Sequence, residues 1–409
     1  MNVLYLSYTG LLEPLGQSQV LAYVRGLSQH YGHRFQIISY EKPQHWADRA
    51  LMQSQYSQLA TQAIGWHPLR YHQRLAAPAT LYDVFRGLPR AIRLVQRHQI
   101  QLVHVRSYVP MLIGIALKKL LGIQLIFDMR GLWADERADL GACTRKSRQY
   151  RAIKALERAS LQAADHVVML TERVKHELRT QAPLAHEPRP TTIIPCCVDT
   201  QRFVADAAIR NTIRHQQGWQ DKTVLVSSGS LGGWYFTVEM AQMFAQWQQH
   251  DPTLHLLVLT TSEPSLIINS LNCYGVAPST YTVRAATPTE VPRWLNAADG
   301  ALMLIQPWYS KIASSPTKQA EYLACGLPIV ANAGVGDSDA LLRDNQVGVV
   351  FDGWDTTTLQ HVWTHFRALL NNPITATRCR QLAETTFNLR IGVNQYHQVY
   401  QSLNQKRPT

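Results

Sequence analysis

Hydrophobic residues along this chain fall into short runs, separated by longer stretches in which apolar positions recur every three or four residues. Runs such as Val3–Ser7, Gln124–Asp128 and Leu254–Leu259 predict buried β-strands. The intervening stretches, such as Met111–Leu121 and Val238–His250, have the spacing of amphipathic helices. Regular alternation of strands and helices predicts an α/β fold in which parallel sheets carry helices on both faces.

The same patterns predict the other elements. Further strands are expected at Gln36–Ser39, Leu102–Val105, His166–Leu170, Thr192–Pro195, Thr223–Ser227, Tyr281–Arg284, Gly300–Leu304, Pro328–Ala331 and Val347–Phe351. Further helices are expected at Gln19–His30, Leu81–His98, Ser147–Ala164, Pro288–Asn296, Pro316–Cys325, Thr357–Asn371 and Leu389–Asn404.

A chain of 409 residues is too long for one compact core, so we expect two doubly wound, Rossmann-like domains. The predicted boundary gives domains 1–198 and 199–388, with a last helix, about 389–409, packing back onto the first domain. Two such domains facing across a cleft would bind ligands beyond the carboxyl ends of their strands.

Bulk composition narrows the class of protein. A hydrophobic content of 46% with 17% charged residues is typical of a folded chain. No apolar run reaches the roughly 20 residues needed to cross a bilayer, and the first residues indicate a strand, not a signal peptide. The six cysteines show no metal-binding spacing, and reduced thiols are expected. Together these features predict a cytoplasmic protein.

Positive charge is concentrated in the first half of the chain. Residues 1–200 hold 25 Lys and Arg against 14 Asp and Glu, whereas residues 201–409 hold 15 against 14. Between Gly65 and His98 there are six arginines and one acid, Asp83. The arginines are Arg70, Arg74, Arg86, Arg90, Arg93 and Arg97. Apolar residues interleave with them at helical spacing, namely Leu81, Val84, Phe85, Leu88, Ile92 and Val95.

A basic amphipathic surface of this kind attracts anionic lipid headgroups by about 1 kcal/mol per nearby basic residue. We therefore expect contact with an anionic membrane surface on the inner face of the plasma membrane. Nucleic acid is the competing partner, but no nucleic-acid motif accompanies the patch. The simpler alternative is a solvated helix packed on its own domain.

The most specific pattern begins at Ser314. Ser315 or Ser314 is expected to cap a helix, with Pro316 in its first position. The open amides at that helix start, together with Lys318, would seat a diphosphate. Glu321 lies one turn later on the same face and would bind ribose hydroxyls. The alternative is an ordinary capped helix that carries a surface ion pair.

Other polar turns directly follow predicted strands. They are 8–19 after the first strand, 128–137 after the fourth, 227–235 after the first strand of the second domain, and 306–311 before the helix just described. Asp128 and Arg130 end a strand and would orient an acceptor hydroxyl, with Asp128 a candidate to take its proton. A structural ion pair between them is the alternative.

These segments, in this order, resemble a bacterial glycosyltransferase of the GT-B architecture, in the large retaining family 4. The strongest parts of the resemblance are Pro14–Gln19, Asp128–Gly131 and Ser314–Asp337, and it extends over essentially the whole chain. The resemblance implies a nucleoside-diphosphate-sugar donor, a UDP- or GDP-sugar, held mainly by the C-terminal domain. It also implies a glycan or glycolipid acceptor in the N-terminal domain, and no metal or other cofactor.

Candidate site residues, argued from their own chemistry and from the resemblance, form three groups. Donor-binding residues would be Gly10, Gly16, Gln17, Gly229, Ser230, Gly232, Arg284, Lys311, Ser314, Ser315, Thr317, Lys318 and Glu321. Acceptor-binding residues would be Trp133, Asp135 and Glu136. Catalytic residues would be Lys318, Asp128 and Arg130.

Two departures from the family pattern affect the donor site. The family often carries two glutamates eight positions apart; the second would be Glu321, but the first position is Ala313. The usual Gly-Arg-x-x-x-x-Lys turn would align with Gly229–Tyr235, which has neither cation. Lys318 and Lys311 are therefore the best candidates to neutralise the diphosphate.

An apparent metal motif is discounted. Asp337-Ser338-Asp339 mimics the Asp-x-Asp sequence of another glycosyltransferase fold, but it precedes a helical pattern, so Asp339 or Ser338 is expected to be a helix cap.

The sequence thus predicts a retaining, metal-independent glycosyltransferase acting on a lipid-linked or polysaccharide acceptor. Two alternatives remain open: a non-hydrolysing nucleotide-sugar epimerase, and a non-catalytic protein that binds nucleotide-sugars or polysaccharide.

Overall fold

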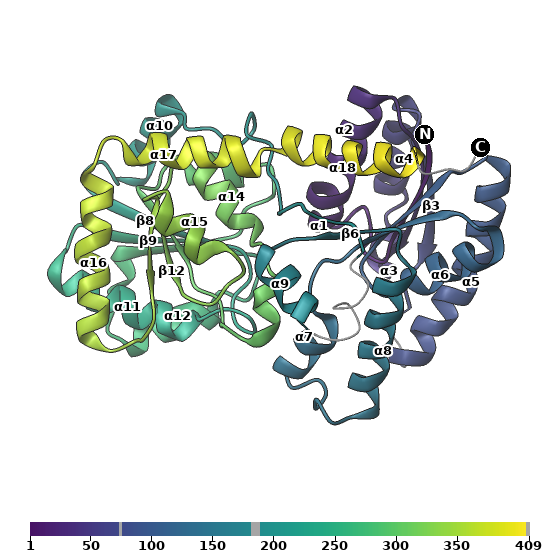
Figure 1. Ribbon diagram of the computed structural model, residues 1–409. Helices are drawn as coiled ribbons and strands as arrows, with labels where there is room; N and C mark the ends of the chain where they lie inside the picture. Colours follow the sequence, from purple (N-terminus) through teal and green to yellow (C-terminus); the bar gives the residue numbers. More distant parts are fainter. Residues whose placement is uncertain (73–75, 181–188, 406–409) are drawn as a thin grey trace. The chain divides into compact units, whose positions relative to one another are not determined.

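The computed structural model describes residues 1–72, 76–180 and 189–405 (Figure 1). The chain divides into two compact units. The N-terminal unit holds Met1–Pro195 and the segment from Leu389 onward, and the C-terminal unit holds Cys196–Asn388. The division therefore falls after Pro195, three residues before the predicted boundary.

Within the described residues, the N-terminal unit is built around a parallel sheet in the order β3-β2-β1-β4-β5-β6-β7. Its strands are β1 (Asn2–Ser7), β2 (Arg34–Glu41), β3 (Gly65–Arg70), β4 (Leu102–Arg106), β5 (Gln124–Asp128), β6 (His166–Met169) and β7 (Thr191–Ile193). Its helices are α1 (Pro14–Gly16), the π-helical turn η1 (Gln17–Leu21), α2 (Ala22–Tyr31), α3 (Pro43–Ala47), α4 (Arg49–Thr61), α5 (Ala76–Arg97), α6 (Met111–Leu121), α7 (Trp133–Asp139), α8 (Arg148–Ala163), α9 (Glu172–Thr180) and α18 (Leu389–Asn404).

The C-terminal unit has a second parallel sheet, in the order β10-β9-β8-β11-β12-β13. Its strands are β8 (Thr223–Ser228), β9 (Leu254–Leu259), β10 (Tyr281–Arg284), β11 (Gly300–Met303), β12 (Ile329–Asn332) and β13 (Gly348–Phe351). Its helices and helical turns are α10 (Ala207–Gln217), α11 (Thr237–His250), α12 (Ser265–Cys273), η2 (Pro278–Thr280), α13 (Val291–Leu295), η3 (Tyr309–Ala313), α14 (Thr317–Ala324), α15 (Ser338–Asp344), α16 (Thr356–Asn371), α17 (Thr375–Leu382) and η4 (Ala383–Phe387).

Strand residues of the second sheet alternate between two cores. Val224 and Val226 of β8 pack into one hydrophobic cluster with residues of α14 and α17, whereas Leu225 packs into another with residues of α11 and α16. Because successive side chains of a strand point to opposite faces, a strand that is apolar throughout needs helices on both sides. This arrangement confirms the predicted α/β fold with two parallel sheets.

The C-terminal helix packs on the N-terminal unit. Within that unit α18 contacts α2, and the two helices lie side by side in Figure 1. Tyr23 and Tyr396 meet edge to face, with ring centroids 5.4 Å apart, and the Tyr400 hydroxyl is 2.7 Å from His104 Nδ1 on β4. The last helix is therefore part of this unit's core.

Among the helices in the described part of the chain, none combines the length and the apolar character needed to cross a membrane.

Candidate active site

The helix that carries the predicted donor site is α14. It begins at Thr317, and Pro316 occupies the N-cap position in an extended conformation, with φ −66° and ψ 121°. The expected cap by Ser314 or Ser315, with Pro316 inside the helix, is therefore wrong. The Ser315 hydroxyl instead accepts a hydrogen bond from the Cys196 amide at 3.1 Å. No side chain caps α14.

Lys318 lies in the first turn of α14 and is half-buried. Its ammonium stands over the ring of Tyr235, 4.2 Å from the centroid. It also lies against Gly229, where an added Cβ would be 3.1 Å from the Lys318 Nζ. Burial lowers the pKa of Lys318 to about 8, although Glu321 acts in the opposite direction. The side chain is thus cationic at neutral pH but loses its proton more readily than an ordinary lysine.

Glu321 follows one turn later and is also half-buried. Burial raises the pKa of Glu321 to about 7, against the opposing charges of Lys318 and Arg202. Within the described residues, no hydrogen bond or salt bridge joins the Lys318 and Glu321 side chains. The simpler alternative of a closed surface ion pair is therefore not what the structure shows, and both groups can take a polar ligand.

Lys311 comes from η3, close before α14. Its side chain is 7% exposed, and the ammonium stands 3.3 Å from the centroid of the Trp234 ring. The backbone of Lys311 is fixed as well, since its carbonyl accepts hydrogen bonds from the amides of Ser314 and Gly336. The two lysines expected at the diphosphate are thus both held on aromatic rings of the 229–235 turn.

The glycine-rich turn after β8 needs its glycines. Gly229, Gly232 and Gly233 all have positive φ, at 110°, 69° and 57°, a region that favours glycine. Several amides of the turn are already bonded: Gly229 donates to the Leu259 carbonyl, and Gly232 donates to the Thr237 hydroxyl. The Ser230 side chain is exposed beside them. The turn is therefore a loop fixed by its own backbone hydrogen bonds.

Arg284 ends β10, as predicted, but its backbone carbonyl accepts a hydrogen bond from the Thr260 amide at 2.9 Å. Its guanidinium stacks on Trp294, with Cζ 3.7 Å from the ring centroid. A contact between the Arg284 carbonyl and a nucleobase would therefore compete with an existing hydrogen bond.

The Asp337–Asp339 segment is structural. Asp337 occupies the N-cap position of α15 without a side-chain hydrogen bond to the helix amides, so the predicted cap by Asp339 or Ser338 is wrong. The Asp339 carboxylate accepts from the Gly334 amide, and the Ser338 hydroxyl donates to Gln319 Oε1 at 2.5 Å. Ser338 thus ties α15 to the first turn of α14.

The loop after β1 is packed tightly on itself. A Cβ at Gly16 would lie 2.0 Å from the Gly10 carbonyl oxygen, and a Cβ at Gly10 would lie 2.5 Å from Glu41 Oε2. Glu41 is fully buried and accepts hydrogen bonds from the Leu11 and Leu12 amides. Gln17 Nε2 donates to the Leu11 carbonyl at 2.7 Å. Gly10, Gly16 and Gln17 therefore have structural roles, whichever ligand they also contact.

Asp128 lies in a buried charged cluster at the carboxyl end of β5. It is 1% exposed, and its carboxylate is 3.3 Å from Arg130 Nη1, 3.6 Å from His104 Nε2 and 3.9 Å from Arg106 Nη1. Burial alone would raise the pKa of Asp128, but Arg130 and His104 outweigh it and hold that pKa well below its usual range. So weak a base is unsuited to take a proton, and the structural ion pair with Arg130, the alternative, is the arrangement observed.

The predicted acceptor residues belong to α7. Asp135 is 1% exposed, and its two oxygens lie 2.7 Å from the Tyr150 hydroxyl and 3.4 Å from Lys154 Nζ. Direct contact between Asp135 and an acceptor is therefore ruled out in this conformation, because its carboxylate anchors α7 to α8. Trp133 and Glu136 are only half-buried, and Tyr108 packs beside Trp133.

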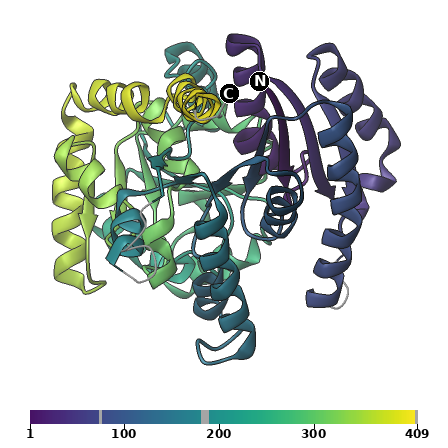
Figure 2. The same cartoon turned by 45° about the vertical axis from the view of Figure 1, so that its right-hand side comes forward.

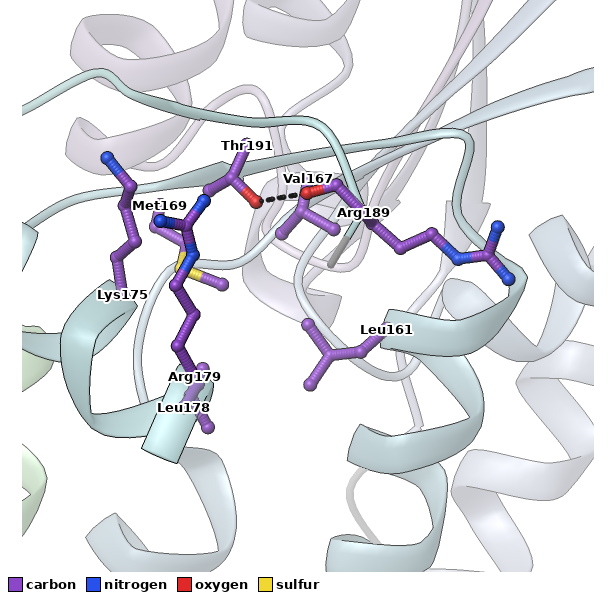
Figure 3. Close-up of a pocket in the computed structure, with 8 residues that line it drawn as sticks. All are labelled: Leu161, Val167, Met169, Lys175, Leu178, Arg179, Arg189 and Thr191. Carbon is purple, nitrogen blue, oxygen red and sulfur yellow. Dashed lines mark hydrogen bonds between the residues drawn. The ribbon is translucent and has the colours of Figure 1, made fainter. Parts of the chain in front are cut away.

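A separate pocket opens in the N-terminal unit between α8, α9 and the β6–β7 edge (Figure 3). Apolar and basic side chains line it together; the lining residues are Leu161, Val167, Met169, Lys175, Leu178, Arg179, Arg189 and Thr191. None of the predicted site residues lines it.

The predictions missed the aromatic residues Trp234 and Tyr235 and the buried acid Glu41. The sequence did contain a sign of the aromatic pair, because Tyr235 occupies the position of the lysine in the Gly-Arg-x-x-x-x-Lys turn. Nothing in the local sequence marked Glu41, whose partners are the amides of a loop about 30 residues away.

Comparisons with known proteins give a family match over part of the chain and a shared fold. Residues 16–202 match the model of glycosyltransferase family 4. No curated protein sequence matches the chain.

Several solved structures share the fold at low sequence identity. Sucrose-phosphate synthase from Thermosynechococcus elongatus superposes with a TM-score of 0.76 at 15% identity, covering 100% of both chains. HepE from Anabaena, solved in complex with UDP, gives 0.69 at 15% identity, covering 98% of this chain and 100% of HepE. WaaG, a glycosyltransferase involved in lipopolysaccharide biosynthesis, gives 0.65 at 17% identity, covering 95% and 97%. The chain therefore has the GT-B fold of these glycosyltransferases, and its residues 16–202 match the model of glycosyltransferase family 4.

Proposed function

We propose that the protein moves a sugar from a nucleoside-diphosphate-sugar to a hydroxyl of a lipid-linked or polysaccharide acceptor, with retention of configuration and without a metal. The C-terminal unit binds the donor and the N-terminal unit binds the acceptor. The observation that carries the proposal is the start of α14, where uncapped amides and Lys318 lie in the first turn and Glu321 follows one turn later. Helix amides and a lysine suit a diphosphate, and a carboxylate suits ribose hydroxyls.

In the proposed reaction, negative charge develops on the diphosphate as the glycosidic bond breaks. The Lys318 ammonium, with Lys311 as a second cation, stabilises that charge without a metal. The acceptor oxygen attacks the anomeric carbon from the face that the diphosphate leaves, and the hydroxyl proton passes to the departing diphosphate oxygen. Two similar structures support this donor class, because HepE was solved with UDP and with UDP-glucose.

The test is to incubate the protein with UDP-glucose or GDP-mannose, with and without a lipid-linked glycan acceptor, and to follow products by proton NMR. If the protein transfers sugar as proposed, nucleoside diphosphate is released only when acceptor is present. An α-linked donor then gives an α-linked product, and EDTA leaves the rate unchanged. An isomerised sugar from donor alone would identify the epimerase instead. Binding without any turnover across a broad acceptor panel would identify a non-catalytic protein.

Donor affinity is expected to fall at alkaline pH. If the Lys318 ammonium binds the diphosphate, affinity for UDP drops about tenfold between pH 7.5 and 9, because burial lowers the pKa of Lys318 to about 8. The Lys318→Arg variant keeps its charge over this interval and should show a flat profile. Calorimetric titration at each pH measures both. A flat wild-type profile would contradict the contact.

We further propose that α5 attaches the protein to an anionic membrane. In the structure Leu81, Tyr82 and Phe85 are 62%, 50% and 74% exposed, and this helix runs along one side of the N-terminal unit (Figure 2). The exposed arginines of the same helix are Arg86, Arg90, Arg93 and Arg97. Arg70 is exposed on β3, and Arg74 lies outside the described residues. Exposed apolar groups beside cations favour an anionic lipid surface at the inner face of the plasma membrane.

The Phe85→Glu variant should lose most binding to phosphatidylglycerol vesicles in co-sedimentation, because it removes an apolar anchor and adds a repelled charge. Leu266→Glu on α12, also an exposed leucine at 47%, is the matched control and should bind as the wild type does. Equal loss in both variants, or no loss in Phe85→Glu, would contradict the assignment of α5.

A further inference from the structure

The turn after β8 presents two consecutive aromatic rings, each beneath a lysine ammonium. Lys311 Nζ stands 3.3 Å from the centroid of Trp234, and Lys318 Nζ stands 4.2 Å from the centroid of Tyr235. Both distances are within the range of a cation–π interaction. The lysines come from different elements, η3 and α14, so the pairing is made by the fold and not by one helix.

The two rings are themselves fixed in place. The Trp234 carbonyl accepts a hydrogen bond from the Gln306 amide at 2.8 Å, and Tyr235 forms a β-bridge with Ile305. Trp308 packs edge-on against Trp234, with centroids 5.4 Å apart. The 234–235 backbone is therefore joined to the chain that continues from β11 toward both lysines.

An aromatic face affects a lysine differently from a carboxylate. A lysine side chain has four rotatable bonds and loses rotamer entropy when it is ordered. A ring restricts the ammonium without neutralising its charge, whereas a close carboxylate would also cancel the charge that an anionic ligand needs. The Lys318 ammonium, held in this way over Tyr235, is oriented in advance and keeps the charge that a diphosphate needs.

We propose that Trp234 and Tyr235 are positioning residues that hold the ammonium groups of Lys311 and Lys318 where the donor diphosphate binds. The inference rests on the proposed function and deepens it. The turn carries no Arg or Lys of its own between Gly229 and Tyr235. Instead, its two aromatic residues hold lysines that come from two other segments of the chain.

The test compares Tyr235→Leu, which removes the ring, with Tyr235→Phe, which keeps the ring face and removes only the hydroxyl. Calorimetric titrations with UDP, GDP, uridine and guanosine separate the diphosphate contribution from the nucleoside contribution. Tyr235→Leu should weaken binding of the preferred nucleoside diphosphate about tenfold and leave the affinity for the corresponding nucleoside unchanged. Tyr235→Phe should stay within about twofold of the wild type. For Lys311 the matching pair is Trp234→Leu, which should weaken diphosphate binding, and Trp234→Phe, which keeps a ring and should bind nearly as the wild type does.

Every other outcome contradicts either the positioning role or the donor site. If Tyr235→Leu binds the diphosphate as the wild type does, or loses the nucleoside equally, the positioning role is wrong. If Tyr235→Phe loses as much as Tyr235→Leu, the hydroxyl and not the ring is responsible. A wild-type protein that binds the nucleoside but gains nothing from the diphosphate also overturns the inference. Failure of the wild type to bind either nucleotide overturns the donor site itself, and the positioning role with it.

Discussion

Replacing Lys318 by alanine is expected to lower sugar transfer by a hundredfold or more, the largest loss among single changes in α14. The ammonium is the cation in the first turn of this helix, and it would meet the diphosphate as negative charge develops on it. Removing one preorganised charge-stabilising group typically costs about 2.7 kcal/mol or more of transition-state stabilisation. Initial rates at saturating and limiting donor give the change in kcat and in kcat/KM.

The matched control is Lys222→Ala. Lys222 immediately precedes β8, at the amino edge of the second sheet, whereas Lys318 lies beyond the carboxyl ends of the strands. This variant should transfer sugar at close to the wild-type rate. Near-unchanged turnover in folded Lys318→Ala, with folding checked by its melting temperature, would remove the leaving-group role.

Replacing Asp128 by asparagine is expected to destabilise the protein by about 3 kcal/mol, because it leaves buried cations without their counter-charge. Arg106 is only 7% exposed and Arg130 packs on the same carboxylate. The measurement is the urea midpoint of the full chain. Glu172→Gln, which breaks an exposed pair with Lys175 on α9, should change stability by less than about 0.5 kcal/mol.

The Asp128 effect also has a defined pH dependence. Because the folded-state pKa of Asp128 is depressed, its stabilisation is present above the unfolded-state pKa, near 4, and is lost as pH falls through the lower folded value. The difference between wild type and Asp128→Asn should therefore be full at neutral pH and shrink in strong acid. A difference that is small at pH 7 would contradict the buried-cluster account.

The fold was largely predictable because buried parallel strands read as continuous apolar runs. The predicted β5, β9 and β10 have the observed bounds, and α6 and α18 do as well. The edge strand β3 was missed, since it contains Pro68 and is only partly buried. Helices α4 and α10 were missed because they are polar, and each is held at its start by an aspartate cap, Asp48 or Asp206.

The candidate site was predictable only at the level of segments. Lys318 and Glu321 were found because one helix face brings them together locally. The roles of Asp135 and Ser315 were not, since each side chain is engaged by a residue distant in sequence or on another helix, Tyr150 and Cys196 respectively. The local sequence pattern identifies polar residues that could act in a site, but tertiary contacts decide which of their side chains remain accessible to a ligand.

The return of α18 to the first unit has a consequence for biosynthesis. A ribosome completes residues 196–388 as one uninterrupted stretch, whereas the earlier half lacks its closing helix until residues 389–404 have been made. During that interval Tyr23 and His104 have not yet met Tyr396 and Tyr400. The half synthesised first is therefore the half finished last, and nascent chains stalled before residue 389 should be the ones that chaperones and proteases engage.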